Sequence, residues 1–227
     1  SVVTYLPEIG DANTAPNQHV TPTYISRSAE DTGSPNIVTG VIIDYRGFDT
    51  MWETSVMFLA GLTTVLVLTS NPVGRRHEEE PFGGLILNVA FRMLVPFTIT
   101  YGIYVLCLGE FSPGGGFQAG ALLSVGVLLA RLILGFDTKF NVLGKTSVVL
   151  AGVGTFLYAF TGWLTLFGGA DFFLNYNYMP IHMEPQHEMH AMGIFLIEIG
   201  VAICVMMTII NLLDAIVKRG DEDGSAQ

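Results

Sequence analysis

Apolar residues along this chain gather into long, nearly uninterrupted runs and do not recur at the spacing of an amphipathic helix. Each run is about 18 to 24 residues long, the length that a helix rising 1.5 Å per residue needs to cross a hydrocarbon core of ~30 Å. Because lipid offers the backbone no hydrogen-bond partner, such runs must be helical. The pattern predicts an all-α polytopic membrane protein with about five transmembrane helices, at Glu53–Thr69, Leu85–Leu108, Gln118–Leu134, Ser147–Gly168 and Ala191–Asp214.

Polar segments divide the chain into regions of different character. Residues 1–35 are rich in Pro, Asn, Thr and Ser and predict an extended extramembrane tail. Residues 36–70 combine a short interfacial helix, too charged to span a membrane, with the first transmembrane helix. A cytoplasmic linker at 71–84 leads to a four-helix unit at 85–217, and residues 218–227 form an acidic tail.

The composition agrees with a membrane protein and argues against other classes. Half of the 227 residues are apolar and 13% are charged, whereas about a quarter of the residues of a soluble domain are charged. A formal net charge of −10 argues against nucleic-acid binding. Cys107 and Cys204 both lie in predicted spans, and there is no cysteine cluster to hold iron–sulfur. We therefore expect no cofactor and no nucleic-acid partner.

Basic residues are distributed unevenly between the connections. Lys and Arg occur in the linker, in Gly135–Thr146 and in the C-terminal tail, whereas Gly109–Phe117 and Gly169–His190 contain none. Cytoplasmic loops of membrane proteins carry the excess of Lys and Arg. The pattern predicts a cytoplasmic C-terminus and an N-terminal segment on the opposite side, although Arg27 and Arg46 in that segment depart from the rule.

The connection between the second and third spans is rich in residues that interrupt a helix. These are Gly109, Pro113, Gly114, Gly115 and Gly116, followed by Phe117. Proline fixes φ and consecutive glycines cost backbone entropy, so the stretch cannot continue a helix. It predicts either a tight helical-hairpin turn or a segment whose backbone closely approaches another part of the protein. No Lys and Ser or Thr follow, which excludes a phosphate-binding loop.

Three stretches carry a family resemblance. The Pro-Gly-Gly-Gly-Phe turn, preceded by Arg92-Met-Leu-Val-Pro-Phe, resembles the B subunit (MnhB-like) of Mrp-type multisubunit sodium/proton antiporters. The run Gly193–Val201 is also similar to that family, whose acidic position is usually Asp and here is Glu198. Asn36–Glu53, which contains Asp44-Tyr-Arg46-Gly47-Phe-Asp49, resembles the segment that ends the large A subunit. The chain thus resembles a fusion of that segment with a B subunit.

Two features depart from the family pattern. The A-type segment normally has a transmembrane helix before the Asp-Tyr-Arg-Gly-Phe-Asp motif, and residues 1–35 contain none. Gln118 follows the glycines where plain antiporters usually have an aliphatic residue, and Gln is more typical of hydrogenase-linked and ferredoxin-linked relatives. In membrane-bound hydrogenases the segment resembling Asn36–Glu53 is a small separate subunit.

The resemblance implies a non-catalytic subunit of a multisubunit monovalent cation/proton antiporter module in a prokaryotic cell membrane. Its partners would be other membrane subunits in the lipid bilayer, and the transported ions would be Na⁺ and H⁺. Two alternatives stay open. One is the same subunit within a membrane-bound hydrogenase or a ferredoxin-dependent respiratory complex, and the other is a purely structural membrane scaffold.

Ionisable residues in or beside the spans are the candidates for an ion pathway. Glu198 lies about seven residues into the last span, where a carboxylate is costly, so it is either a functional acid or a packing residue bonded to a neighbouring Lys or Arg. Glu53 opens the first span as a pathway residue or a helix cap. Glu110 faces an aqueous entrance or solvent beside the glycines. Arg92 snorkels to the surface or pairs with a buried acid.

Two other polar groups have local interpretations. Asp44, Arg46 and Asp49 are close in sequence, which favours local pairing over transport. The connection before the last span contains a polar cluster of His182, Glu184, His187, Glu188 and His190. It lacks the i, i+4 histidine pair of zinc proteases. We interpret this cluster as a solvated loop and expect no metal site.

Overall fold

The computed structural model of this protein describes residues 5–68, 84–112, 114–134, 144–181 and 187–225. Over these residues every regular element is a helix. Five helices are long and apolar enough to cross a membrane: α3 (Gly47–Leu68), α4 (Leu85–Cys107), α5 (Gly115–Leu134), α6 (Lys145–Phe167) and α7 (His187–Ser225). The prediction of an all-α fold with about five spanning helices is confirmed.

The helix bounds follow the hydropathy runs, with the largest difference at α7. The predicted last span began at Ala191 and ended at Asp214, whereas α7 extends from His187 to Ser225. Helical backbone hydrogen bonds are internal to the segment, so a helix can continue past the hydrocarbon region into polar residues. Hydropathy therefore locates the spanning part of a helix and underestimates its length.

The N-terminal region differs from the predicted extended tail, because Ala15–Thr32 form helix α1. Proline occupies the first turn, where its missing N–H is not needed, and Gly33 ends the helix in the left-handed region with φ 68°. Ser28 and Thr32 are the buried residues of α1. Tertiary contacts on one face stabilise a helix whose polar composition does not predict it.

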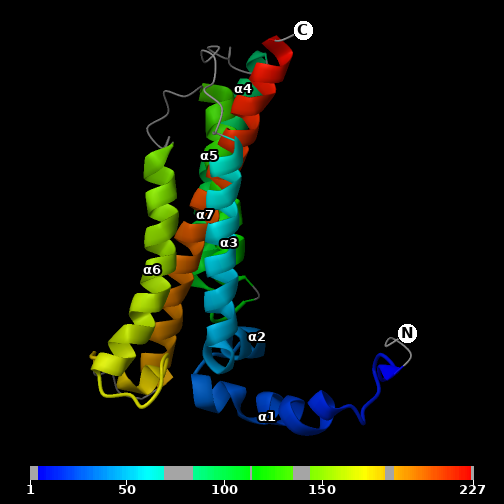
Figure 1. Cartoon of the computed structure of the whole chain (residues 1–227), viewed down its shortest axis with the longest axis vertical. Coiled ribbons are helices and arrows are strands. Elements are labelled where there is room, and N and C mark those ends of the chain that lie inside the picture. The colour runs from blue at the N-terminus through cyan, green and yellow to red at the C-terminus, as the bar shows by residue number, and fades with distance from the viewer. Residues whose placement is uncertain (1–4, 69–83, 113, 135–143, 182–186, 226–227) are drawn as a thin grey trace.

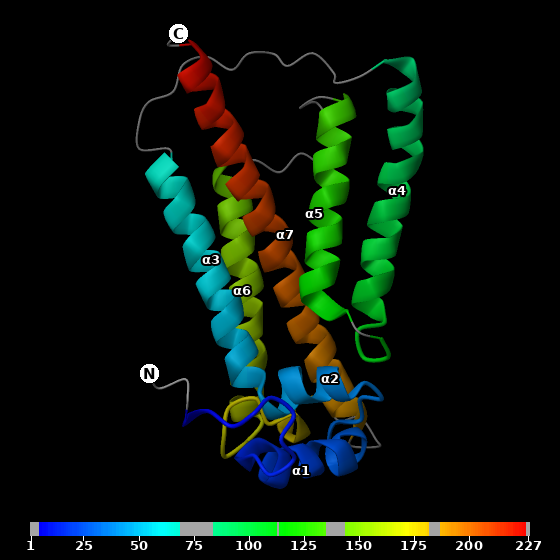
Figure 2. The same ribbon diagram turned by 90° about the vertical axis from the view of Figure 1, so that its right-hand side faces the viewer.

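Two short helical segments connect α1 to α3. They are α2 (Ile37–Thr39) and the π-helical η2 (Gly40–Tyr45). A Cβ on Gly40 would lie 2.6 Å from Ser28 Oγ, so glycine at this position allows η2 to approach α1 closely. Figures 1 and 2 show α1 and α2 together at one end of the bundle.

Helix α7 is the central helix of the bundle (Figure 2). It packs against α3, α5 and α6, whereas α4 packs mainly against α5. In the apolar window of α7, 67% of the residues are buried, compared with 11% for α3 and for α4. The main hydrophobic cluster includes Ile194, Ile197, Val201 and Val205 of α7. A polar side chain on this face of α7 is therefore surrounded by protein.

The five long helices alternate in direction along the bundle (Figure 1). One end holds α1, α2, the 3₁₀ turn η3 (Tyr176–Tyr178) and the beginning of α7. The C-terminal end of α7 lies at the opposite end. Residues from the two halves of the sequence therefore meet at the N-terminal end of the bundle.

Candidate functional site

Glu198 lies on the buried face of α7, in the stretch that contributes Ile194, Ile197 and Val201 to the core. The residue is 1% exposed. Within the described part of the chain, neither carboxylate oxygen has a hydrogen-bond partner. An isolated charge removed from water is strongly unfavourable, so this group is stable as a neutral acid or beside a bound cation. Both states are chemically available to a group that exchanges protons or monovalent cations.

The glycine turn, which we define as residues 109–116, packs against this carboxyl group. A Cβ on Gly109 would overlap both carboxylate oxygens, and a Cβ on Gly115 would lie 2.5 Å from Glu198 Oε1. Gly115 also has φ +68°, a conformation that favours glycine. Of the two interpretations of this turn, close backbone approach describes the structure. Pro113 lies outside the described residues.

Glycines at the start of α5 bring that helix against α7 beside the site. A Cβ on Gly116 would overlap the carbonyl oxygen of Glu198, and a Cβ on Gly120 would lie 2.7 Å from the carbonyl oxygen of Ala202. Small residues four positions apart allow membrane helices to approach closely. Gly114 is half-buried, and Phe117 packs against the main hydrophobic cluster. The residues predicted to form a structural motif therefore also determine the packing around Glu198.

Glu110 is half-buried in the glycine turn. Burial raises the pKa of its carboxyl group above the ordinary value of 4.5. It lies close enough to Glu198 for the two carboxyl groups to repel each other when both are ionised. The structure thus brings together two of the four candidate pathway residues.

The other two candidates lie elsewhere. Glu53 is exposed on α3, and Arg92 is exposed on α4, where its Nε donates a hydrogen bond of 2.6 Å to Asn88 Oδ1. Arg92 lies near the beginning of α4, whereas the glycine turn follows the end of that helix. The chain does not join either residue to Glu198.

The segment containing Asp44, Arg46, Gly47 and Asp49 makes both local and long-range contacts. Arg46 Nη2 lies 2.6 Å from Asp49 Oδ2, which confirms the expected local pairing for these two residues. The hydrogen bond to Asp49 raises the pKa of the Arg46 guanidinium. The Gly47 carbonyl oxygen accepts a hydrogen bond of 2.6 Å from the Tyr158 hydroxyl. Asp44 is not part of the local pair.

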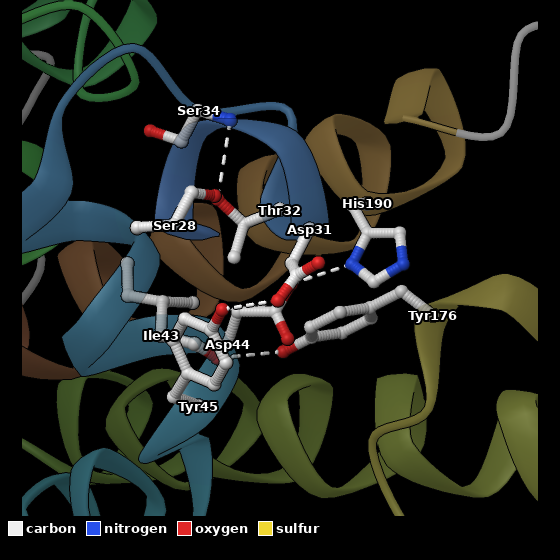
Figure 3. A network of polar contacts seen from close by, with 9 residues as sticks. All are labelled: Ser28, Asp31, Thr32, Ser34, Ile43, Asp44, Tyr45, Tyr176 and His190. Atoms are coloured by element: carbon white, nitrogen blue, oxygen red, sulfur yellow. Dashed lines mark hydrogen bonds and ion pairs between the residues drawn. The ribbon is translucent and has the colours of Figure 1, made fainter. Parts of the chain in front are cut away.

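Asp44 instead pairs with a histidine that the sequence analysis placed in a solvated loop (Figure 3). His190 Nδ1 lies 2.5 Å from Asp44 Oδ2, and His190 is 8% exposed in the first turns of α7. The loop interpretation is therefore wrong for His190. It precedes Ile194, Ile197 and Val201 at helical spacing, and this pattern places it on the buried face. Continuing the apolar stripe backwards by one turn would have identified it.

Further hydrogen bonds join α1 and η2 to the loop before α7 (Figure 3). The Tyr45 hydroxyl donates to Asp31 Oδ2 at 2.6 Å, and the Tyr176 hydroxyl donates to the Ile43 carbonyl oxygen at 2.9 Å. The hydrogen bond from Tyr45 lowers the pKa of Asp31. Burial, followed by that same bond, raises the pKa of Tyr45 to about 12. These contacts anchor the N-terminal elements to the bundle.

A second pair of contacts, which sequence reasoning also missed, lies toward the C-terminal end of α7. Arg131 Nη1 of α5 forms an ion pair of 2.6 Å with Asp214 Oδ1, and both side chains are largely buried. The Ser147 hydroxyl of α6 donates a hydrogen bond to Asn211 Oδ1. Asn211 and Asp214 continue the buried stripe of α7, which was the available signal. In the described residues, no group of three or more His, Cys, Asp or Glu side chains is arranged to hold a metal ion.

Comparison with known families gives two matches that together cover most of the chain. The family described as "Domain related to MnhB subunit of Na+/H+ antiporter" matches residues 86–211. The MbhE family, described as the E subunit of MBH, matches residues 12–73. The two matched regions are the four-helix unit and the N-terminal elements with α3.

Individual relatives are similar over more than half of this chain. The uncharacterized protein MJ1307 of Methanocaldococcus jannaschii is 29% identical over 160 residues, which are 56% of this chain and 61% of that protein. The B subunit of the Na(+)/H(+) antiporter of Bacillus subtilis is 25% identical over 138 residues, 58% of this chain and 96% of that protein. The putative antiporter subunit mnhB2 of Staphylococcus haemolyticus is 30% identical over 132 residues, 58% of this chain and 93% of that protein. The alignment with MJ1307 spans less than two thirds of that relative.

Two solved structures share the fold. A chain of the archaeal membrane-bound sulfane sulfur reductase aligns with a TM-score of 0.65 and 24% identity, over 96% of this chain and 94% of that one. A chain of the Mrp complex from Dietzia sp. DQ12-45-1b aligns with a TM-score of 0.61 and 27% identity, over 86% of this chain and 22% of that one. Both are chains of membrane complexes.

Proposed function

Because the chain belongs to the family of domains related to the MnhB subunit of Na+/H+ antiporters, we propose that it is a membrane subunit of a multisubunit, Mrp-type monovalent cation/proton antiporter module. In this proposal it carries no catalytic site and shapes the route of Na⁺ and H⁺ beside other membrane subunits. The proposed location is a prokaryotic cell membrane, with the C-terminus in the cytoplasm.

The observation that carries the proposal is the buried Glu198 carboxyl group. It lies on the central helix, and within the described residues it has no hydrogen-bond partner. Ionisable groups inside a membrane are costly and mark ion pathways or proton relays in many transporters. A packing role would be expected to provide a Lys or Arg partner, and the described residues provide none. We therefore assign proton or cation exchange to Glu198.

The other candidates have separate parts in this proposal. Glu110 lies in the glycine turn next to Glu198 and would form the approach to it. Glu53 and Arg92 are exposed on α3 and α4, and ionised side chains in spanning helices avoid lipid. We propose that these two residues face partner subunits of the complex or the membrane surface.

The test is the transport activity of Glu198 variants in membrane vesicles. Glu198→Gln keeps the shape of the side chain and removes its ionisable group, so sodium-dependent proton flux should fall while the complex remains assembled. Glu198→Asp should retain part of the flux. Glu188→Gln is a matched control, because Glu188 is an exposed glutamate on the same helix. Wild-type flux in the Gln variant would reduce Glu198 to a packing residue and favour the scaffold function.

A second candidate is the same subunit within a redox-driven membrane complex. The match of residues 12–73 to the MbhE family favours it, because MBH denotes the membrane-bound hydrogenase type of complex. Purification of the native complex distinguishes the two candidates. Hydrogenase-like or ferredoxin-dependent subunits that copurify with this chain would identify a redox-driven complex, whereas antiporter subunits alone would support the first proposal.

A further inference from the structure

We propose that Ser34 and Thr39 are positioning residues for Glu198, which act by holding the backbone of the glycine turn in place. This inference rests on the proposed role of Glu198 and identifies residues from the other family-matched region that determine its surroundings. It concerns the segment Ser34–Thr39, between α1 and η2, which we call the clamp.

The backbone of the glycine turn needs hydrogen-bond donors from outside its own helix. Helix α4 ends at Cys107, and the last carbonyl groups of a helix have no intrahelical partner. Buried carbonyl groups without partners are destabilising, so native structures satisfy them with side chains, other backbone or water. Gly109 is buried and Glu110 is half-buried, immediately after the end of α4.

The clamp supplies these donors. Thr39 Oγ1 donates a hydrogen bond of 2.8 Å to the Gly109 carbonyl oxygen. Ser34 Oγ donates at 3.1 Å, and the Asn36 backbone N–H donates at 3.2 Å, to the Glu110 carbonyl oxygen. Ser34 is 1% exposed and Thr39 is 7% exposed, so water does not compete for these bonds.

The same residues that accept these hydrogen bonds form the wall against Glu198. A Cβ on Gly109 would overlap both carboxylate oxygens of Glu198, so there is no spare space between the turn and the carboxyl group. A small displacement of Gly109 would therefore change the packing and the access of water at Glu198. The clamp makes that displacement less favourable, because the Gly109 carbonyl is bonded to a buried hydroxyl.

The arrangement also connects the two regions that match different families. The clamp lies within residues 12–73, and the glycine turn and Glu198 lie within residues 86–211. The N-terminal region thus has a defined effect on the site besides anchoring α1. Its contribution depends on two hydroxyl groups, which can be removed with little change in side-chain volume.

The experiment measures amide hydrogen exchange of the glycine turn in the complete complex by mass spectrometry. Thr39→Val and Ser34→Ala each remove one hydroxyl donor, and exchange in peptides that cover residues 108–117 should rise about three- to tenfold, as expected for the loss of one buried hydrogen bond. Thr39→Ser keeps the donor and should exchange at the wild-type rate. Thr63→Val is the control, because the Thr63 hydroxyl bonds only within α3, to the Leu59 carbonyl oxygen, at an exposed position.

A second measurement separates positioning from anchoring. If the clamp positions the site, Thr39→Val should lower sodium-dependent proton flux at an unchanged yield of complex, and Thr39→Ser should restore it. Wild-type exchange in both Thr39→Val and Ser34→Ala would overturn the inference. So would increased exchange with wild-type flux, in a complex whose flux depends on Glu198. Failure of the proposed function has a different signature, which is unchanged flux in Glu198→Gln, and the exchange measurement would then still decide whether the clamp holds the turn.

Discussion

Hydroxyl and carboxyl groups at the N-terminal end of the bundle connect residues that are far apart in the sequence. Tyr158 and Tyr176 donate to backbone carbonyls of Gly47 and Ile43, and Tyr45 donates to Asp31 of α1. Each bond fixes one of the short N-terminal elements to the rest of the chain. The attachment of α1 therefore depends on a small number of polar side chains.

Asp31→Asn should loosen α1 at neutral pH, because it removes the charge that accepts the Tyr45 hydrogen bond. That bond lowers the pKa of Asp31 below its ordinary value of 3.8 in the folded protein. Its contribution to stability is therefore present above pH 3.8 and is lost as the pH falls through the lower folded value. We expect exchange of the amides in residues 15–32 to be about two- to fivefold faster in the variant at neutral pH.

The pH dependence provides the control for this prediction. Below the folded pKa of Asp31 the wild-type carboxyl group is also neutral, so the ratio of exchange rates between variant and wild type should approach one. A ratio that stays constant from neutral to acid pH would mean that the Asp31 charge does not hold α1.

At the scale of helices, glycine determines how closely α5 approaches α7. Gly116 and Gly120 face carbonyl oxygens of α7, and Gly154 of α6 faces the Gly200 carbonyl oxygen on another side of the same helix. Van der Waals packing between close backbones is a main source of helix association in lipid, where no hydrophobic effect drives it. The central position of α7 follows from small residues on both neighbours.

Gly116→Ala should destabilise the bundle, because the new Cβ would overlap the Glu198 carbonyl oxygen and approach Val201 Cβ to 2.8 Å. Overpacking of this kind costs about 1–3 kcal/mol. Gly152→Ala is the matched control, since its Cβ would only reach ordinary contact with Phe58, at 3.4 Å. Alanine is also the better helix former. The thermal midpoint of the purified complex should fall in the first variant and stay or rise in the second; equal midpoints would contradict close packing at Gly116.

At the scale of the whole molecule, five alternating spans place the two terminal regions at opposite ends of the bundle (Figure 1). The basic residues of the chain indicate which end is cytoplasmic. Arg75, Arg76 and Lys139 occur in connections at the end to which the C-terminus of α7 points, and Gly169–His190 at the other end has no Lys or Arg. The positive-inside rule then predicts a cytoplasmic C-terminus.

Cysteine labelling on intact cells tests this topology. In a Cys107→Ser background, Thr23→Cys on the exposed face of α1 should react with a membrane-impermeant maleimide from outside. Ser225→Cys at the end of α7 should react only after the membrane is permeabilised. The reverse pattern would overturn the orientation, and labelling of both positions from outside would contradict five spans.

The hydropathy of the sequence was sufficient to predict the spanning helices, because the requirement that the backbone bond internally in lipid acts on each segment separately. For the same reason the depth of Glu198 and the break at the glycine turn could be recognised before any packing was known. Local ion pairing of Arg46 with Asp49 was also predictable from their spacing. These features depend on residues that are neighbours in the sequence.

Which segments meet was decided by the tertiary structure alone. The contact between the glycine turn and Glu198, the pairing of Asp44 with His190, and the hydrogen bond from Thr39 to Gly109 all join residues distant in the sequence. A single sequence records the composition of each face but not which face it packs against. The helix α1 escaped prediction for a related reason, since its stability comes from contacts with η2 and α7 and not from its own polar residues.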